Sequence, residues 1–188
     1  MNLKEYIKVY DNIIPHDVCD DIIKCYEKCV GDPNSSRLHD DNHKKFQEMN
    51  LQKNTDTYGS ANYEILHNAF TEIFQNYRSI IWEGKWVPVT SSREPLKVKK
   101  YPPNGHFKQH IDCGRWETMT RFLSAFVYLN ESEGTQFWDD YTIEGKKGRV
   151  VVFPPNWMFP HKSLNGDKVK YFMGTYALFD HPLHRSKA

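Results

Sequence analysis

Apolar side chains recur at helical spacing in two stretches of the N-terminal half. Pro15 suits the opening turn of the first helix, because its missing N–H is not needed there. The apolar stripe that follows consists of Val18, Ile22, Cys25, Tyr26 and Cys29. A stronger stripe consists of Tyr63, Leu66, Phe70, Ile73, Phe74, Tyr77 and Ile80. Both patterns predict amphipathic helices. We expect the first to stop at residues 31–36, and the second to end near Gly84 and pack against a sheet.

From Trp86 onward the pattern changes to short apolar runs separated by Gly, Pro and Asn. These runs predict strands at residues 97–101, 109–112, 121–130, 135–138, 148–153 and 169–179. Residues 4–14 alternate loosely and predict one further strand at the start of the chain. Short strands at this spacing are typical of a barrel or sandwich, and no repeat or linker divides the chain. We predict a mostly β (α+β) fold in one domain, 1–188, with helical support and a polar loop at 1–85 and a jelly-roll core at 86–180.

Residues 31–60 interrupt the pattern, because Asp, Asn, Ser, Lys and Gln dominate them. This composition predicts a long loop with a short helix at most. Long loops inside compact domains are usually either functional or disordered. Two interpretations therefore stay open, a lid over a functional site and a disordered surface insertion.

Composition narrows the class of protein. Apolar residues make up 39% of the 188 and aromatic residues 14%, which suits a globular core. No run approaches the ~20 apolar residues that span a bilayer. A net charge of +1 gives no general attraction to nucleic acid, and the basic run at residues 97–100 is interpreted as solvated surface. We expect neither a membrane nor a nucleic-acid partner.

His110 and Asp112 carry the candidate chemistry. They lie two residues apart in a predicted strand, so both side chains should project from one face. His161, which follows the apolar run 150–153 and a turn-rich segment, is the best third ligand. Two histidines and one carboxylate form a facial triad, which leaves about three of six octahedral positions open and favours non-haem Fe(II).

The spacing alone leaves another interpretation open, in which His110 is a core histidine satisfied by Asp112. The same spacing also occurs in His39-Asp40-Asp41. That stretch is polar and has no flanking strand pattern, so we do not expect a metal site there. A zinc site formed by Cys19, Cys25 and Cys29 is a further alternative, but small apolar helix residues are the favoured interpretation.

Four sequence blocks surround the proposed ligands. Tyr101 and Phe107 precede His110; residues 121–130 and then 133–137 follow it; residues 148–153 lead to His161, Lys170, Tyr171 and Tyr176. In this order, across residues 98–179, the blocks resemble the prolyl 4-hydroxylase family of Fe(II)/2-oxoglutarate oxygenases. The resemblance implies a double-stranded β-helix, a cupin-like jelly roll buttressed by N-terminal helices.

The resemblance also implies a dioxygenase that uses Fe(II), 2-oxoglutarate and O2, with ascorbate as a candidate reductant. Lys170 matches the basic residue that holds the C5 carboxylate of 2-oxoglutarate, and Lys168 is its rival because both share strand parity. Tyr128 matches a hydroxyl that contacts this carboxylate in some relatives. Tyr101 and Thr135 are further candidates, although Glu133-Gly134 stands where the family has paired glycines.

For the substrate, the resemblance implies a peptidyl residue, first of all proline, in a peptide or protein. Candidate substrate contacts are Arg121, Trp138, Trp157 and Tyr176. We expect aromatic residues at the mouth of the barrel (Trp138, Tyr141, Trp157 and Phe159) to suit an extended polyproline II segment. A free amino acid would instead need charged partners, and Arg121 is the only obvious spare candidate.

Three other functions remain as alternatives. The first is a 2-oxoglutarate oxygenase that acts on a free amino acid or another small metabolite. The second is a metal-binding jelly roll that does not use 2-oxoglutarate, and the third is a non-catalytic binding sandwich with structural histidines. The chain lacks the secretory signal and retention tetrapeptide of the family's collagen-modifying members. Together with the cysteine usage, this predicts a cytoplasmic enzyme of a microbial cell or a virus-infected host.

Overall fold

The computed structural model describes residues 2–81 and 84–179. Its helices are α1 (His16–Cys29), α2 (Thr55–Tyr58) and α3 (Ser60–Ile80), with 3-10 turns η1 (Leu3–Tyr6), η2 (Leu51–Asn54), η3 (Gly84–Trp86) and η4 (Trp116–Thr118). Its strands are β1 (Lys8–Tyr10), β2 (Ser36–Asp40), β3 (Lys44–Asn50), β4 (Lys97–Tyr101), β5 (His106–His110), β6 (Arg121–Tyr128), β7 (Ser132–Phe137), β8 (Tyr141–Gly145), β9 (Val150–Phe153), β10 (His161–Ser163) and β11 (Lys170–Leu178).

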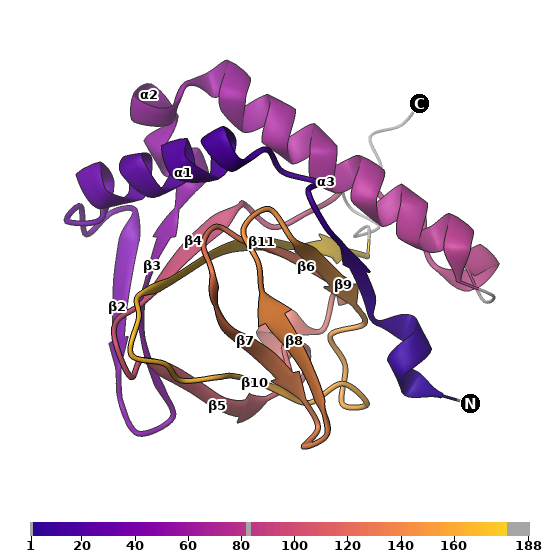
Figure 1. Cartoon of the computed structure of the whole chain (residues 1–188). Helices are drawn as coiled ribbons and strands as arrows, with labels where there is room; N and C mark the ends of the chain where they lie inside the picture. The colour runs from indigo at the N-terminus through magenta and orange to yellow at the C-terminus, as the bar shows by residue number, and fades with distance from the viewer. Residues whose placement is uncertain (1, 82–83, 180–188) are drawn as a thin grey trace.

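All strands join one antiparallel sheet in the order β1-β9-β6-β11-β4-β3-β5-β10-β7-β8, with β2 paired to β3. The sheet curls so that β5, β10, β7 and β8 face the wall formed by β4, β11, β6 and β9 (Figure 1). Helices α1 and α3 lie across the outside of that second wall (Figure 1). This is the predicted jelly roll buttressed by helices, and the sheet takes strands from both halves of the chain.

Strands β6 and β9 show how the sequence builds two cores on the two sides of one wall. Ala125 and Val127 pack with the helices, whereas Phe126 and Tyr128 point into the barrel. The same alternation places Val150 and Val152 outside and Val151 and Phe153 inside. Because successive side chains of a strand project to opposite faces, a nearly continuous apolar run serves both cores.

The two predicted helices are confirmed as α1 and α3. Tyr63, Leu66, Phe70, Ile73 and Tyr77 are the buried residues of α3 and pack in the outer core. Cys19 and Cys25 are buried in the same core, which agrees with their interpretation as apolar helix residues. Among the described residues, the only cluster with metal-ligand geometry lies elsewhere. The strand predicted over residues 4–14 is shorter, since Leu3–Tyr6 forms a 3-10 turn before β1.

The predicted loop at residues 31–60 is wrong. The segment contains the hairpin β2–β3, and β3 pairs with both β4 and β5 inside the sheet. Its apolar anchors, Phe46, Met49 and Leu51, are buried but spaced irregularly. Polar residues occupy the intervening positions because one face of this hairpin lines a polar cavity. A half-buried strand with polar side chains on its functional face lacks the alternation that marks a strand in the sequence.

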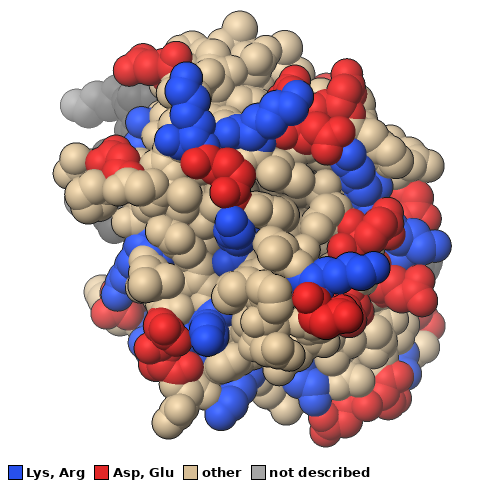
Figure 2. Space-filling model, turned by 60° about the vertical axis from the view of Figure 1, so that its left-hand side comes forward, with Lys and Arg blue, Asp and Glu red and all other residues tan. Residues whose placement is uncertain are grey.

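Charged side chains of both signs are mixed on one face of the molecule. On the face shown in Figure 2, Lys and Arg side chains are interspersed with Asp and Glu side chains, and neither sign forms an extended patch. None of the helices in the described part of the chain has the length and apolarity to cross a membrane.

Candidate metal centre and cosubstrate pocket

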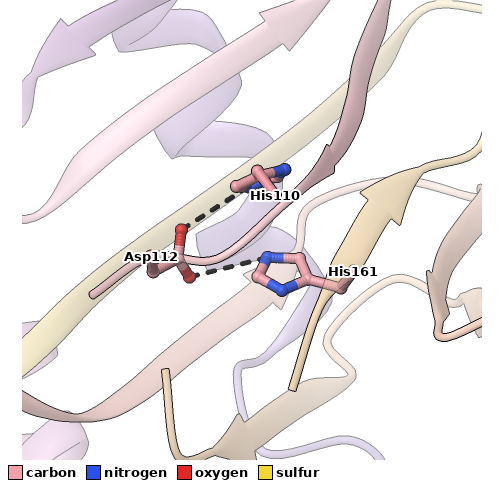
Figure 3. Close-up of side chains that lie close together, drawn as sticks. All are labelled: His110, Asp112 and His161. Atoms are coloured by element: carbon pink, nitrogen blue, oxygen red, sulfur yellow. Dashed lines mark ion pairs between the residues drawn. The ribbon is translucent and has the colours of Figure 1, made fainter. Parts of the chain in front are cut away.

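Three predicted ligands converge inside the barrel. His110 ends β5, Asp112 lies in the turn after it, and His161 begins β10, directly opposite His110 in the register. The two carboxylate oxygens of Asp112 lie 3.5 Å from His110 Nε2 and 3.5 Å from His161 Nε2 (Figure 3). One ligand atom from each residue falls within 4.8 Å of the others. The expected strand at 109–112 therefore ends two residues early, but the three side chains still meet.

The hydrogen bonds of the two imidazoles favour a bound cation. His110 Nδ1 lies 2.8 Å from the Lys108 carbonyl oxygen, and His161 Nδ1 lies 3.1 Å from that of Phe159. Because a carbonyl only accepts, each Nδ1 carries the proton and each Nε2 presents a lone pair to Asp112. Lone pairs and a carboxylate then converge without a donor between them. A divalent metal ion satisfies this donor set, which fits Fe(II).

Electrostatics hold the candidate ligands in the forms that bind metal. Burial lowers the pKa of His161 to about 4, against the opposing charge of Asp112, so its imidazole is neutral near pH 7. Burial alone would raise the pKa of Asp112. In acid, where His161 is protonated, its charge and the hydrogen bond with His110 outweigh burial and hold the pKa of Asp112 well below its usual range, so this carboxyl is ionised near pH 7. Neutral imidazole and ionised carboxylate are the forms that bind metal.

Hydrogen bonds at both its N–H and its carbonyl hold the backbone of Asp112 in place. The backbone N–H groups of Asp112 and Cys113 donate to the Pro155 carbonyl at 3.1 and 2.9 Å. Arg121 donates from Nη1 to the Asp112 carbonyl at 2.8 Å. The rest of the guanidinium binds Glu94 through two hydrogen bonds of 2.5 and 3.0 Å. Arg121 therefore positions the turn that carries the ligand and is not a spare cation.

A cavity of about 980 Å³ contains the triad and extends from the barrel interior to the β2–β3 hairpin. Tyr101, Thr135, Ser163 and Phe172 line it on the interior side. Arg37, Glu48, Glu94, Lys97 and Lys99 are among the residues that line the remainder. The hairpin predicted as a loop thus forms one wall of the cavity, and the structure describes it as part of the sheet.

Lys170 is buried at the start of β11, opposite Tyr101. Its ammonium donates to the Gly134 carbonyl at 2.7 Å and to Ser163 Oγ at 2.8 Å. Burial lowers its pKa to about 7, although the charge of Glu133 opposes this shift. Lys168, the rival candidate, is exposed. A buried ammonium beside the cavity is suited to pairing with an anion, whereas Lys168 is solvated.

Tyr128 and Thr135 lie close to Lys170. Tyr128 is fully buried and its hydroxyl donates to Thr135 Oγ1 at 2.7 Å. The rings of Tyr101 and Tyr128 lie 5.4 and 5.6 Å from the Lys170 ammonium. Gly134 lies within β7, where the register against β8 shifts, and its φ is +93°; a Cβ there would lie 1.9 Å from the Ile143 carbonyl oxygen. Only glycine fits this backbone, which presents its carbonyl to Lys170.

The predicted substrate contacts separate into two groups. Arg121 and Tyr176 line the cavity and stack, with the guanidinium carbon 3.9 Å from the ring centroid. Trp138 and Trp157 are not among the lining residues. Trp138 donates from Nε1 to the Met158 carbonyl and packs on Phe159, which is fully buried, and Trp157 is exposed. Trp138 and Trp157 as substrate contacts therefore stay predictions, while charged side chains are among the residues that line the cavity itself.

Sequence reasoning missed Lys99 and Glu48. Both line the cavity, and they lie opposite each other in the β3–β4 register. The interpretation of residues 97–100 as solvated surface is wrong for Lys99. The alternation of side chains along the strand could have indicated this, because Lys99 lies two residues before Tyr101 and shares its face. His39 lies on β2, where no strand was expected, and its Nε2 is 3.5 Å from Glu48.

Comparison with known proteins places this geometry in a family. The sequence profile described as "2OG-Fe(II) oxygenase superfamily" matches residues 96–177, a span that contains the triad and Lys170. The profile covers a little under half of the chain, and over that span the protein is similar to 2OG-Fe(II) oxygenases. It is a dioxygenase that uses Fe(II), 2-oxoglutarate and O2, as predicted. No curated protein matches the sequence at a significant level.

Solved structures show that the oxygenase has the fold of prolyl hydroxylases. A prolyl hydroxylase from Trichoplax adhaerens, in complex with a peptide fragment of hypoxia inducible factor, matches with a TM-score of 0.72 at 12% identity; the match covers 92% of this chain and 83% of that one. A Pseudomonas putida prolyl-4-hydroxylase matches with a TM-score of 0.65 at 18% identity and 94% coverage of each chain. The 2OG complex of a viral collagen prolyl hydroxylase from Paramecium bursaria Chlorella virus-1 matches with a TM-score of 0.60 at 18% identity, over 91% of this chain and 94% of that one.

Proposed function

We propose that this oxygenase hydroxylates a prolyl residue within a peptide, with His110, Asp112 and His161 as the iron ligands. The observation that carries the proposal is the convergence of these three ligand side chains in a cavity that also reaches the buried Lys170 region. When bound, Fe(II) and 2-oxoglutarate supply oxidative chemistry in which O2 converts 2-oxoglutarate to succinate and CO2 while a substrate C–H becomes C–OH.

The protein's own residues bind, orient and exclude water. Lys170 is proposed to hold the C5 carboxylate of 2-oxoglutarate, with Ser163 and Thr135 as neighbouring hydroxyls. Tyr128 keeps Thr135 oriented through its hydrogen bond, and Tyr101 closes the apolar side of the pocket against Phe46 and Phe172. Lys170 is buried with the rings of Tyr101, Tyr128 and Phe172 near its ammonium, and a charge-assisted hydrogen bond is stronger in such a buried place.

Two observations support a peptide as the substrate. A five-carbon diacid fills only part of a cavity of about 980 Å³, which leaves room for a larger molecule beside it. The Trichoplax prolyl hydroxylase, which shares the fold, was solved with a peptide. Proline is the proposed target because all three neighbours named above are prolyl hydroxylases.

The test measures succinate release and a substrate mass gain of one oxygen atom with Fe(II), 2-oxoglutarate and a panel of proline-containing peptides. We expect peptide hydroxylation by the natural protein and none by His161→Ala. Free proline is the competing substrate, and the charged groups that line the cavity are the observation that favours such a metabolite. Turnover of free proline without turnover of any peptide would contradict the peptide assignment.

The cellular location is a separate proposal. We infer a cytoplasmic, reducing compartment, which is supported by four cysteines that are all free, two of them buried in the helical core. Fractionation of the source cell tests this, and recovery of the protein with secreted material would contradict it.

A further inference from the structure

Lys99 is a cation in the cavity without a carboxylate partner. It lies on β4 between Lys97 and Tyr101, and alternation along the strand turns it to the cavity side. Its ammonium lies 5.1, 5.9 and 5.4 Å from the ring centroids of Phe46, Phe107 and Phe172. Within residues 2–81 and 84–179, no carboxylate oxygen is within 4.0 Å of it. Three aromatic rings thus hold the charge in place without neutralising it.

The carboxylates near Lys99 act on its charge from beyond 4.0 Å, and none forms an ion pair with it. Glu48 faces it across the β3–β4 register, but the group within 4 Å of Glu48 is His39. Glu94 forms its close ion pair with Arg121, and Asp112 lies between the two histidines of the triad. Burial lowers the pKa of Lys99, and the charges of Glu48 and Asp112 oppose this. An ammonium at this place is stabilised when an anion enters the cavity.

The cavity as a whole carries an excess of unpaired positive charge. Four of its lining cations have no carboxylate within 4.0 Å among the described residues: Arg37, Lys44, Lys99 and Arg115. The lining carboxylate that has not yet been mentioned, Asp41, accepts backbone N–H groups of its own turn. The complete chain has a net charge of only +1, so this excess is a local property of the cavity.

Iron and cosubstrate leave this charge in place. Fe(II) carries two positive charges, and Asp112 and the doubly ionised 2-oxoglutarate carry three negative charges. One negative charge remains, and Lys170, which is buried beside the cosubstrate pocket, offsets it. Lys99 lies two residues before Tyr101, the residue that pairs with Lys170, and its own neighbours across the sheet are Glu48 and Phe172. Its charge therefore remains available to the substrate, which is the second molecule in the cavity.

We propose that Lys99 selects a substrate with a carboxylate close to the carbon that is hydroxylated. The carboxylate belongs either to an acidic side chain next to the target residue or to the C-terminus of the substrate itself. Lys99 is a specificity-determining residue in this assignment and takes no part in the oxidation. The proposal rests on the proposed function for the identity of the target residue, but carboxylate recognition is measured independently of it.

The experiment compares matched substrates in the natural protein and in Lys99→Gln, Lys99→Glu and Lys100→Gln. The first set consists of amidated peptides that each contain one proline, with Asp, Asn or Lys next to it on either side. The second set is a pair of peptides that end in proline, one with a free C-terminal carboxylate and one with a C-terminal amide. Lys100 is the matched control, since it lies on the opposite face of β4 and pairs with Glu27. The KM for 2-oxoglutarate is measured for every variant and reports that the fold and cosubstrate pocket are intact.

We expect the natural protein to favour one carboxylate source, the Asp peptide or the free acid, about tenfold or more in kcat/KM over its neutral counterpart. Lys99→Gln should remove this preference, and Lys99→Glu should favour the Lys peptide. Lys100→Gln should retain the preference, and the KM for 2-oxoglutarate should change by less than about twofold in all three variants.

Three outcomes would overturn the proposal. These are equal turnover of acidic and neutral substrates by the natural protein, a preference that survives Lys99→Gln, and a large rise in the KM for 2-oxoglutarate in that variant. The last would assign Lys99 to the cosubstrate. If only free proline and no peptide is hydroxylated, the proposal of a peptide substrate fails, but the proposal for Lys99 does not. Comparison of proline with prolinamide then tests carboxylate recognition by Lys99 in the same variants.

Discussion

Replacement of Lys170 by methionine separates its charge from its packing, because the two side chains are similar in length. The ammonium is buried and donates to the Gly134 carbonyl and Ser163 Oγ at 2.7 and 2.8 Å. If it also binds the C5 carboxylate, it contributes a charge-assisted hydrogen bond of roughly 1.5–3 kcal/mol. Loss of that bond should raise the KM for 2-oxoglutarate by roughly 10- to 150-fold. Lys168→Met is the control, since that side chain is exposed.

The pH dependence of the KM for 2-oxoglutarate is a second measure of the charge on Lys170. Burial lowers the pKa of Lys170 from 10.5 to about 7, so above pH 7 the unliganded protein loses the proton. A bound carboxylate favours the ammonium, and 2-oxoglutarate must then bind together with a proton. The KM for 2-oxoglutarate should rise by about tenfold for each pH unit above 7 until the pKa of the complex is reached. Lys170→Arg keeps its charge and should lose this dependence.

The free energy of unfolding should also depend on pH through Lys170. Between pH 7 and 10.5 the unfolded chain binds the Lys170 proton and the folded chain does not, so the free energy of unfolding contributed by this group rises with pH across that window. Lys170→Met should remove this contribution, which denaturant titration at several pH values detects. A KM for 2-oxoglutarate that is unchanged in Lys170→Met, or that rises as much in Lys168→Met, would refute the reasoning.

Two further predictions follow from groups beside the triad. Glu94→Gln weakens the pair that holds Arg121 on the Asp112 carbonyl, so Fe(II) affinity measured by anaerobic titration should fall about 10- to 100-fold; unchanged affinity would show that Asp112 does not depend on this pair. Phe46→Ala removes a buried ring that lies 4.9 and 5.5 Å from the centroids of Tyr101 and Phe107, and should lower the free energy of unfolding in urea by about 3–5 kcal/mol. A loss below ~1 kcal/mol would mean that the β2–β3 hairpin is not anchored by this ring.

The parts of the fold with a strong periodic pattern could be predicted from the sequence. The stripe from Tyr63 to Ile80 determines α3, and the apolar runs determine β6, β9 and β11. The β2–β3 hairpin could not be predicted, because its side chains face a polar cavity on one side and leave no alternation. Its place in the sheet depends on pairing with β4, about 50 residues later in the chain, and local periodicity carries no information on such pairing.

The candidate site, like the fold, could be predicted only in part from the sequence. His110, Asp112 and His161 could be found by residue type and order, although Asp112 reaches the site from a turn fixed by Pro155 and not from a strand. Arg121 was expected to face substrate, but its partners Glu94 and the Asp112 carbonyl come from separate segments and are visible only in the fold. Of the aromatic residues expected at the mouth, Phe159, Trp138 and Tyr141 pack in the inner core, whereas Trp157 is exposed. Lys99 was hidden in a basic run that looks like ordinary surface.

Anaerobic titration of Fe(II) in the presence of 2-oxoglutarate tests the central claim most directly. The visible charge-transfer absorption of the Fe(II)–2-oxoglutarate chelate reports both partners at one site. We predict saturation at one Fe(II) per chain, and loss of the signal in His110→Ala, Asp112→Ala and His161→Ala. His39→Ala and Asp41→Ala, which alter the other His and Asp pair with the same spacing, should retain it. No signal from the natural protein, or a signal that survives Asp112→Ala and is lost in His39→Ala, would contradict the account.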